Sequence, residues 1–239
     1  MTAIPKIHRP TATTLLALTA LAVIAGGCGK TAERKDAAPV ADTVQTAAAA
    51  PNVISGTFTD SRDGKTYRTV GIGNQTWMAE NLNYTIGKSV CYDNKESNCQ
   101  QYGRLYDWKT ALKACPAGWH IPSDAEWEML VEYVDPDASG DYGNNAGMKL
   151  KSKTGWSTDK YYEAATDDYG FSALPGGCRD GGSFYGAGDY GNWWSATEYV
   201  VHYAWRRIMN YNYGFVRRNY INKTGLFSLR CVEDNAAQR

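Results

Sequence analysis

Cysteine is the residue type with the clearest chemical use in this 239-residue chain, and the first of its six cysteines stands near the N-terminus. Cys28 follows Ala25-Gly26-Gly27, which comes after a basic start and an apolar run from Leu15 to Ile24. That order is typical of a bacterial signal peptide. Because a Cys directly after such a cleavage site can be diacylated, the pattern predicts a signal peptide over 1–27 and lipidation of Cys28. Ala25 stands where these sites usually carry Leu, so secretion without a lipid is the alternative.

The segment that follows is expected to be a disordered stalk. Residues 28–52 are rich in Ala, Thr, Pro, Lys and Asp and contain no aromatic residue, so they bury too little apolar surface to offset their ordering entropy. Several acyl chains make membrane anchoring stable, and Gly29 in place of Asp favours the outer membrane or cell surface over the inner membrane. We expect an extracytoplasmic, lipid-anchored protein with one domain over 53–234 and a tail over 235–239.

The remaining five cysteines predict two disulfides and one free thiol, because an extracytoplasmic location permits oxidation. Cys91 and Cys99 flank a short polar loop, which fits a stapled hairpin. Cys115 ends a helical segment and Cys231 lies in the last apolar strand. A bridge between them would tie the start of the core to its end and stabilise the fold by about 4 to 5 kcal/mol in the chain-entropy model. Cys178 is then interpreted as an inert, partly buried thiol.

Aromatic residues between about Gly181 and Tyr220 form the candidate ligand-binding site, where they alternate with Asn, Asp and Arg. Flat rings beside planar hydrogen-bonding side chains suit the face and the hydroxyls of a sugar, and the same mixture suits protein contact surfaces. Because large aromatic side chains are mostly buried, Trp193 and Trp194 can instead belong to the core. The candidate binding residues are Tyr185, Tyr190, Trp193, Tyr199, Trp205, Tyr211 and Tyr213.

Other chemistry has less support. Lys plus Arg and Asp plus Glu number 25 each, so no basic excess points to nucleic acid. His120 and His202 have no Cys or Glu at zinc-ligand spacing, and we expect no catalytic constellation and no resident metal. Calcium alone stays open, since aspartates supply hard oxygen ligands. The aspartates concerned, whose spacing matches no EF-hand loop, are Asp167, Asp168, Asp180 and Asp189.

Short elements are expected to position these residues. Alternating apolar and polar residues around Asp63-Gly64 predict a hairpin over 53–70, and a second turn at Gly73-Asn74-Gln75 extends it into a meander. Ser123 and Glu126 form a capping box ahead of a helix that stops at Asp135-Pro136.

Further along the chain, the signals are weaker. We expect another helix over 106–114, a short turn over 148–150 and a closing strand over 226–232. From Gly155 onward, Gly, Asn, Asp, Tyr and Trp dominate without a helical period, which predicts loops and short strands.

Five segments of the core resemble the Fibrobacter succinogenes major paralogous domain family. They are Trp77–Leu82, Tyr102–Trp108, Cys115–Trp127, Gly191–Thr197 and Phe227–Val232. More distantly, Trp119–Trp127 and Leu229-Arg230-Cys231 resemble the formylglycine-generating domains, whose fold is an elaborated C-type lectin-like fold. The resemblance implies an α+β, C-type lectin-like domain (sulfatase-modifying-factor-like), with two helices, short antiparallel strands and long loops. It also implies a bridge from a helix end to the last strand, which agrees with the Cys115–Cys231 pairing.

The oxidising cysteine pair of the formylglycine-generating enzymes has no counterpart here, because residues 199–224 contain no Cys. The sequence therefore predicts a lectin-like, non-catalytic binding module for carbohydrate or another surface macromolecule. An enzyme that uses the same aromatic groove and a structural envelope protein are the alternatives.

Overall fold

The computed structural model describes residues 53–137, 142–143, 145–158 and 164–234. The expected signal peptide, lipidated Cys28, stalk and C-terminal tail lie outside the described residues. Within the described part of the chain, no helix has both the length and the apolar character needed to cross a bilayer.

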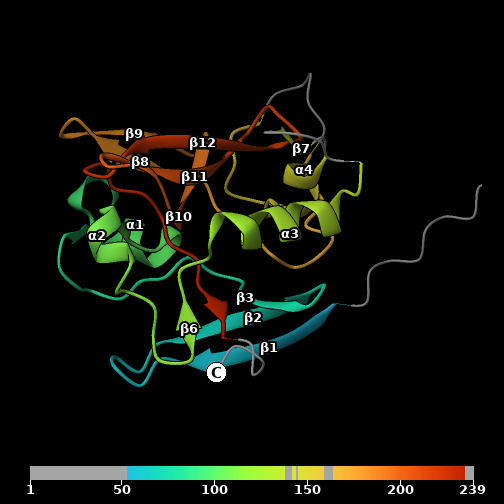
Figure 1. Cartoon of the computed structure of the whole chain (residues 1–239), viewed down its shortest axis with the longest axis horizontal. Helices are drawn as coiled ribbons and strands as arrows, with labels where there is room; N and C mark the ends of the chain where they lie inside the picture. The colour runs from blue at the N-terminus through green and yellow to red at the C-terminus, as the bar shows by residue number, and fades with distance from the viewer. Residues whose placement is uncertain (1–52, 138–141, 144, 159–163, 235–239) are drawn as a thin grey trace, which may run out of the picture. The chain divides into compact units, whose positions relative to one another are not determined.

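The described residues form two main antiparallel sheets with few helices, as Figure 1 shows. The first sheet has the order β1 (Ile54–Thr59), β2 (Thr66–Ile72), β3 (Gln75–Met78), β13 (Val232–Glu233) and β6 (Trp119–His120). The second has the order β10 (Tyr190–Val200), β11 (Tyr203–Asn210), β12 (Val216–Asn222) and β7 (Tyr142–Gly143). Two-stranded pairs join β4 (Ser89–Val90) to β5 (Leu105–Tyr106) and β8 (Gly176–Asp180) to β9 (Ser183–Ala187). The helical elements are the 3₁₀ turn η1 (Tyr92–Asn94), α1 (Glu96–Tyr102), α2 (Trp108–Ala111), α3 (Asp124–Val134) and α4 (Ala146–Leu150).

The first sheet begins with the expected meander. β1 pairs with β2 from Ile54 opposite Gly71 to Thr59 opposite Thr66, and β2 pairs with β3. The tight turns fall at Gly64 and Gly73, which have φ values of 74° and 61°. Such positive φ values favour glycine because it has no Cβ.

Helix α3 begins at the expected capping box. The Ser123 hydroxyl accepts a hydrogen bond from the Glu126 backbone amide, while the Glu126 carboxylate accepts one from the Ser123 amide. Trp127, Leu130 and Val134 are buried, and the helix ends before Asp135. In Figure 1, α3 lies between the two main sheets. One core cluster joins these α3 residues to side chains of β2, β3 and β10–β12.

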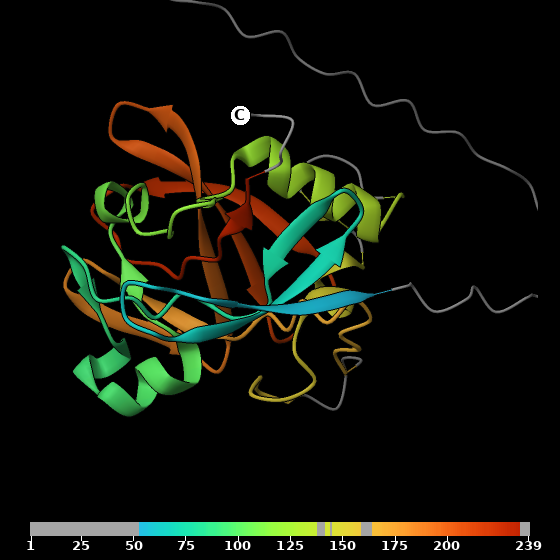
Figure 2. The same ribbon diagram turned by 90° about the horizontal axis from the view of Figure 1, so that it is seen from below.

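β10 is buried on both of its faces. Trp193 packs in the cluster with α3, whereas Trp194 belongs to a second cluster with Tyr106 and Phe227. Both tryptophans are fully buried, so the alternative that they belong to the core is confirmed. The far end of the β10–β11 hairpin is exposed and projects from the body of the domain in Figure 2.

Several expectations about secondary structure are wrong, among them the closing strand over 226–232, of which only Val232 lies in a strand, β13. The C-terminal half contains long strands, of which β10 has 11 residues, because burial on both faces hides the period-two pattern of a half-exposed strand. The segment between Cys91 and Cys99 is η1 followed by α1, which has no apolar period in its sequence, and is not a hairpin loop. There are four α-helices among the described residues, where two were expected, and α2 covers only four of residues 106–114.

Candidate ligand-binding site

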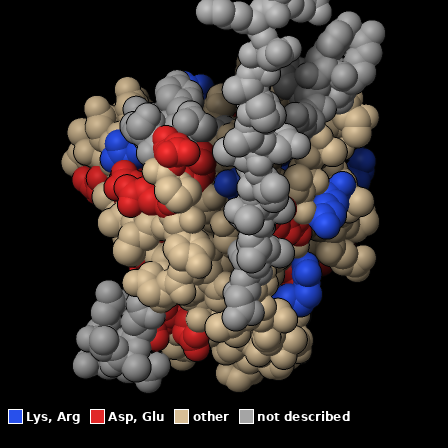
Figure 3. Space-filling view, turned by 90° about the vertical axis from the view of Figure 1, so that its right-hand side faces the viewer, with Lys and Arg blue, Asp and Glu red and all other residues tan. Residues whose placement is uncertain are grey.

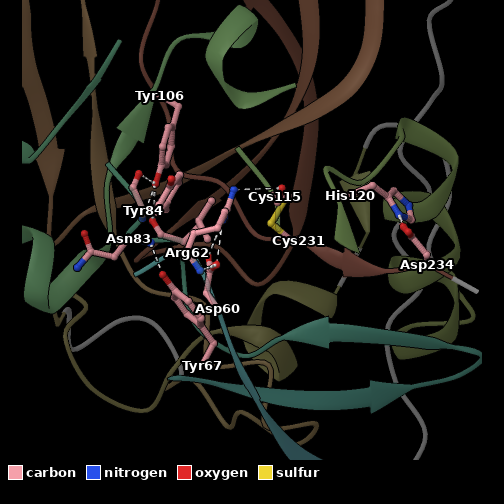
Figure 4. The surroundings of a disulfide bond; sticks show 11 residues. Asp60, Arg62, Tyr67, Asn83, Tyr84, Tyr106, Cys115, His120, Cys231 and Asp234 are labelled. Atoms are coloured by element: carbon pink, nitrogen blue, oxygen red, sulfur yellow. Dashed lines mark hydrogen bonds and ion pairs between the residues drawn. A yellow bond between two sulfur atoms is a disulfide. The ribbon is translucent and has the colours of Figure 1, made fainter. Parts of the chain in front are cut away.

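Both expected disulfides are present in the structure. Cys91 bonds to Cys99 and Cys115 bonds to Cys231, while Cys178 is free. The second bridge joins the segment after α2 to the residue just before β13 (Figure 4). The chain between these two cysteines spans a sequence separation of 116, so the bridge fixes the ends of most of the domain relative to each other.

A pocket of about 460 Å³ lies on the face of the second sheet that is opposite α3. The strand register places Asn192 opposite Ile208 and Ile208 opposite Arg217, so these three side chains point to the same face and form the floor. The β8–β9 hairpin and the loop between β11 and β12 supply the walls. The lining residues are Cys178, Tyr185, Gly186, Tyr190, Asn192, Arg206, Ile208, Asn210, Tyr213, Phe215 and Arg217.

The wall from β9 depends on glycine at two places. Gly181 and Gly182 both have positive φ and form the tight β8–β9 turn, in which the primed geometry matches the twist of the strands. Gly186 lies under Tyr190, because a Cβ built on Gly186 would come within 2.6 Å of Cδ2 of that ring. The absence of a side chain at Gly186 therefore lets the Tyr190 ring lie against β9.

Three tyrosines of the pocket are exposed to solvent. The exposed fractions of Tyr185, Tyr190 and Tyr213 are 55%, 42% and 45%. The Tyr213 ring stacks on Phe215, with centroids 4.9 Å apart and an angle of 19° between the planes. The pocket thus offers flat apolar surfaces beside amide and guanidinium groups.

Arg206 is the most buried charged group of the pocket. One of its terminal nitrogens donates a hydrogen bond of 3.0 Å to Oδ1 of Asn192, and the other lies 3.4 Å from Oδ1 of Asn219. The guanidinium also lies over the ring of Phe227, 4.9 Å from the centroid. Its Nε is buried and has no hydrogen-bond partner among the described residues. Burial lowers the pKa of Arg206 from 12.5 to about 10, so this side chain is still charged at neutral pH.

The structure divides the seven aromatic candidates among four places. Only Tyr185, Tyr190 and Tyr213 line the pocket. Trp193 is fully buried and donates its indole N–H to Asn81, so its assignment to a binding surface was wrong. Trp193 is buried because strand β10 is covered on both faces, so that its side chain packs in the core.

The other three candidates lie outside the pocket lining. Tyr199 and Trp205 are close together, with ring centroids 4.8 Å apart, in a separate aromatic cluster near the β10–β11 tip. Tyr220 stacks on Tyr199 at 4.1 Å. Tyr211 is partly buried, and its carbonyl oxygen lies 3.4 Å from the ammonium of Lys151.

Several pocket residues were missed in the sequence. They include Asn192, Arg206, Ile208, Asn210, Phe215 and Arg217. Reading β10 and β11 as strands would have placed alternate residues from Tyr190 and from Arg206 on one face, since side chains in a strand alternate between faces. That signal was present but depended on recognising the long strands.

No three of the aspartates considered for calcium form a metal-ligating group among the described residues. The Asp167 carboxylate accepts hydrogen bonds from Ser172, that of Asp180 from the Gly181 amide, and that of Asp189 from the Ser157 hydroxyl. Among the described residues, the one group with three metal-ligating side chains is Cys91, Glu96 and Cys99. Its two thiols are joined in a disulfide and are therefore not free to ligate.

His120 makes a local ionic cluster in the first sheet. Its Nε2 lies 2.8 Å from a Glu126 carboxylate oxygen, and its Nδ1 lies 2.7 Å from that of Asp234 (Figure 4). The bond to Glu126, opposed by burial and assisted by the bond to Asp234, raises the pKa of His120 above 6.5. Because Glu126 is also the capping-box residue of α3, the cluster holds the helix start against the C-terminal strand.

The face of the domain that Figure 3 shows carries its charged side chains in small groups. On the face shown in Figure 3, acidic side chains gather in separate groups, and Lys and Arg side chains are scattered over uncharged surface. The aromatic pocket, by contrast, combines exposed rings with amide and guanidinium groups in one cavity.

These features define the class of the protein: an α+β domain built from small antiparallel sheets with few helices, stapled by two disulfides. The family profile described as the Fibrobacter succinogenes major domain matches residues 70–233, and the chain belongs to this family. The expected family membership is thereby confirmed. No curated protein and no solved structure matches the chain.

Proposed function

We propose that the protein is an extracytoplasmic lipoprotein whose domain binds carbohydrate in the aromatic pocket. The observation that carries the proposal is the convergence of three exposed tyrosines with Asn192 and Arg206 in one cavity. Its volume of about 460 Å³ lies in the range of roughly 300–1,000 Å³ that is usual for small-molecule sites.

The chemistry of the lining suits a sugar. The C–H faces of a pyranose ring pack on aromatic rings, and its hydroxyls pair with planar amide and guanidinium groups. No Asp, Glu or His occurs among the lining residues, so the pocket lacks the usual general acids and bases of glycoside hydrolysis. We therefore propose binding without catalysis and, because no three of the candidate aspartates form a metal-ligating group among the described residues, without calcium.

We further propose that the fold is a C-type lectin-like variant. Support comes from the Cys115–Cys231 bridge, which ties a helical segment to the end of the chain as in the distantly similar formylglycine-generating domains. Further support comes from the position of the pocket beside the irregular hairpins in the C-terminal half of the domain.

Binding is tested with the full-length chain in detergent micelles, on glycan arrays and on insoluble polysaccharides, with calcium and with a chelator. We expect retention that Tyr190→Ala reduces at least fivefold. The matched control is Tyr133→Ala, which removes a tyrosine of similar exposure (54%) from α3. Absence of retention on every glycan in both conditions would contradict the proposal, and release of new reducing ends would show an enzyme.

The anchor is tested separately. The basic segment, the apolar run and Gly26-Gly27-Cys28 support a lipid on Cys28, and the absence of Asp at residue 29 supports the outer membrane or cell surface. Cells fed an alkyne fatty acid should label the wild-type chain and Cys178→Ser, but not Cys28→Ser. Equal labelling of all three chains, or labelling of none, would refute lipidation at Cys28.

A further inference from the structure

Among the described residues, the lining of the pocket carries basic side chains and no carboxylate. Of its eleven lining residues, two are arginines, Arg206 and Arg217, and none is acidic. Burial is the main cause of the lowered pKa of Arg206, and the nearby Cys178 and Asp180 raise that pKa without offsetting the burial. A ligand with a negative charge would offset the cost of burying the Arg206 guanidinium, whose Nε has no hydrogen-bond partner among the described residues.

Arg207, the next residue in the same strand, has the carboxylate partner that Arg206 lacks within the described part of the chain. Arg207 points to the opposite face of β11, where its guanidinium lies 2.5 Å from the carboxylate of Asp124 in α3. Arg206 has only two amide oxygens as hydrogen-bond acceptors and no carboxylate within salt-bridge distance among the described residues. Buried guanidinium groups are normally neutralised by a carboxylate or saturated by hydrogen bonds.

A second buried arginine, Arg230, is stabilised by hydrogen bonds instead of by a carboxylate. Arg230 also has no carboxylate partner among the described residues, but its terminal nitrogens contact the carbonyl oxygens of Phe171 and Ser172 and the side chain of Asn81. Arg230 lies in the core and is not among the residues that line the aromatic pocket. Arg206 differs because it uses two of its five N–H donors on the protein and borders a cavity open to solvent.

We infer that the sugar recognised by the pocket carries a carboxylate, and that the ligand class is a uronic-acid-containing polysaccharide. This inference rests on the proposed function. The Arg206 guanidinium pairs with the ligand carboxylate, because its planar donors match the two oxygens of that group. The Tyr190 ring, which lies against Gly186, packs on the sugar face.

The first test changes the ligand and leaves the protein intact. Binding of the full-length chain in micelles to polygalacturonate is compared with binding to its methyl ester, which keeps the ring and loses the charge. We expect at least tenfold weaker binding of the ester. We also expect binding of polygalacturonate, and not of the ester, to weaken as NaCl is raised, because salt screens charge interactions.

The second test changes the charge in the pocket. Arg206→Gln should lower the affinity for polygalacturonate at least tenfold and bring the ratio between acid and ester close to one. The matched control is Arg68→Gln, which removes the same charge from an exposed pair with Glu80 on β2 and should leave the ratio unchanged. A ratio that survives Arg206→Gln would overturn the role of Arg206.

Cys178 provides a readout that does not depend on a variant. It lines the pocket and is the free thiol among the described cysteines. Polygalacturonate should slow its alkylation severalfold in the wild-type chain, while the ester at the same concentration should not. An unchanged alkylation rate would place the acidic ligand elsewhere.

The outcomes separate the inference from the proposed function. Equal affinity for acid and ester would overturn the carboxylate and leave sugar binding intact, whereas no binding of any glycan would overturn both. Tighter binding of dextran sulfate, or of peptides through their C-terminal carboxylate, would overturn the uronic-acid assignment.

Discussion

Asp124 is the residue whose replacement tests the packing of α3 against the second sheet most directly. Its carboxylate lies 2.5 Å from a terminal nitrogen of Arg207 and 2.7 Å from one of Arg218. The Arg207 side chain is 2% exposed, whereas that of Arg218 is 26% exposed and also lies 3.4 Å from Glu128. Removal of the Asp124 carboxylate therefore destabilises the buried Arg207 more than the partly exposed Arg218.

The magnitudes follow from that difference. In Asp124→Asn, the buried Arg207 keeps only the exposed carboxylate of Glu128, 3.9 Å away, as a counter-ion, and we expect a loss of about 3 kcal/mol of unfolding free energy. In Arg207→Met, Asp124 keeps its hydrogen bonds to Arg218, so we expect a smaller loss of about 1–3 kcal/mol. In the double variant no buried arginine lacks a partner, and the loss should be smaller than in Asp124→Asn alone.

Acid unfolding provides a second signature. Burial opposes ionisation of Asp124, but the hydrogen bond from Arg218 and the charge of Arg207 outweigh it, so the pKa of Asp124 lies below 3.8. A carboxylate with a lowered folded-state pKa contributes stability above its unfolded-state pKa, and that stability is lost as the pH falls through the folded-state value. Asp124→Asn should therefore weaken the dependence of stability on pH below about pH 4.

Urea unfolding under oxidising conditions, followed by tryptophan fluorescence, measures these changes. The matched control is Arg68→Met, whose exposed pair with Glu80 should contribute no more than about 1 kcal/mol. The reasoning is refuted if the double variant loses the sum of the two single losses, because the buried charges would then act independently.

Three further predictions concern the stapled fold and the pocket. His120→Gln should flatten thermal stability measured between about pH 6 and 8, because a raised folded-state pKa gives stability that is complete below pH 6.5 and is lost as the pH rises through that pKa; an unchanged profile would contradict this. Serine replacement of Cys115 and Cys231 should lower the unfolding free energy in urea by about 5 kcal/mol, because this disulfide closes a sequence separation of 116. Serine replacement of Cys91 and Cys99, with a separation of 8, should lower it by about 2.5 kcal/mol. Equal losses would reject the loop-entropy explanation. Gly186→Ala should reduce glycan binding at least threefold by displacing the Tyr190 ring, whereas Gly188→Ala, which has a similar positive φ and 3.6 Å to its nearest neighbour, should not.

The parts of the fold that could be predicted are those that depend on local chemistry. The capping box, a motif of four residues from Ser123 to Glu126, determines where α3 begins. The turn at Gly64 determines the position of the first hairpin. The disulfides were predictable because few pairings of five cysteines agree with the spacing and the apolar pattern. In each case the determining residues are close in the sequence or are chemically distinctive.

The parts that could not be predicted depend on tertiary contacts. Helix α1 has no side-chain cap and buries only Cys99, so its sequence resembles a polar loop and its stability comes from the disulfide to Cys91 and from the surrounding chain. The β10 sequence shows no alternation because Trp193 and Trp194 enter two different core clusters. The charge at Arg206 is informative only once the strand register separates it from Arg207 and from Asp124.

The position of the pocket relative to the core suggests how affinity and selectivity are divided. Asn192 and Arg206 lie on β10 and β11, which both core clusters hold in place, so these two pocket groups keep their geometry without a ligand. The pocket walls carry Tyr185 and Tyr213 on a hairpin and a loop that can vary without disturbing the core. Preorganised groups lower the entropic cost of binding a charged ligand. If the pocket binds acidic glycans as proposed, the walls should determine which neighbouring sugars fit. Substitutions at Tyr185 or Tyr213 should accordingly change the order of preference among acidic glycans, while substitution of Arg206 should weaken all of them.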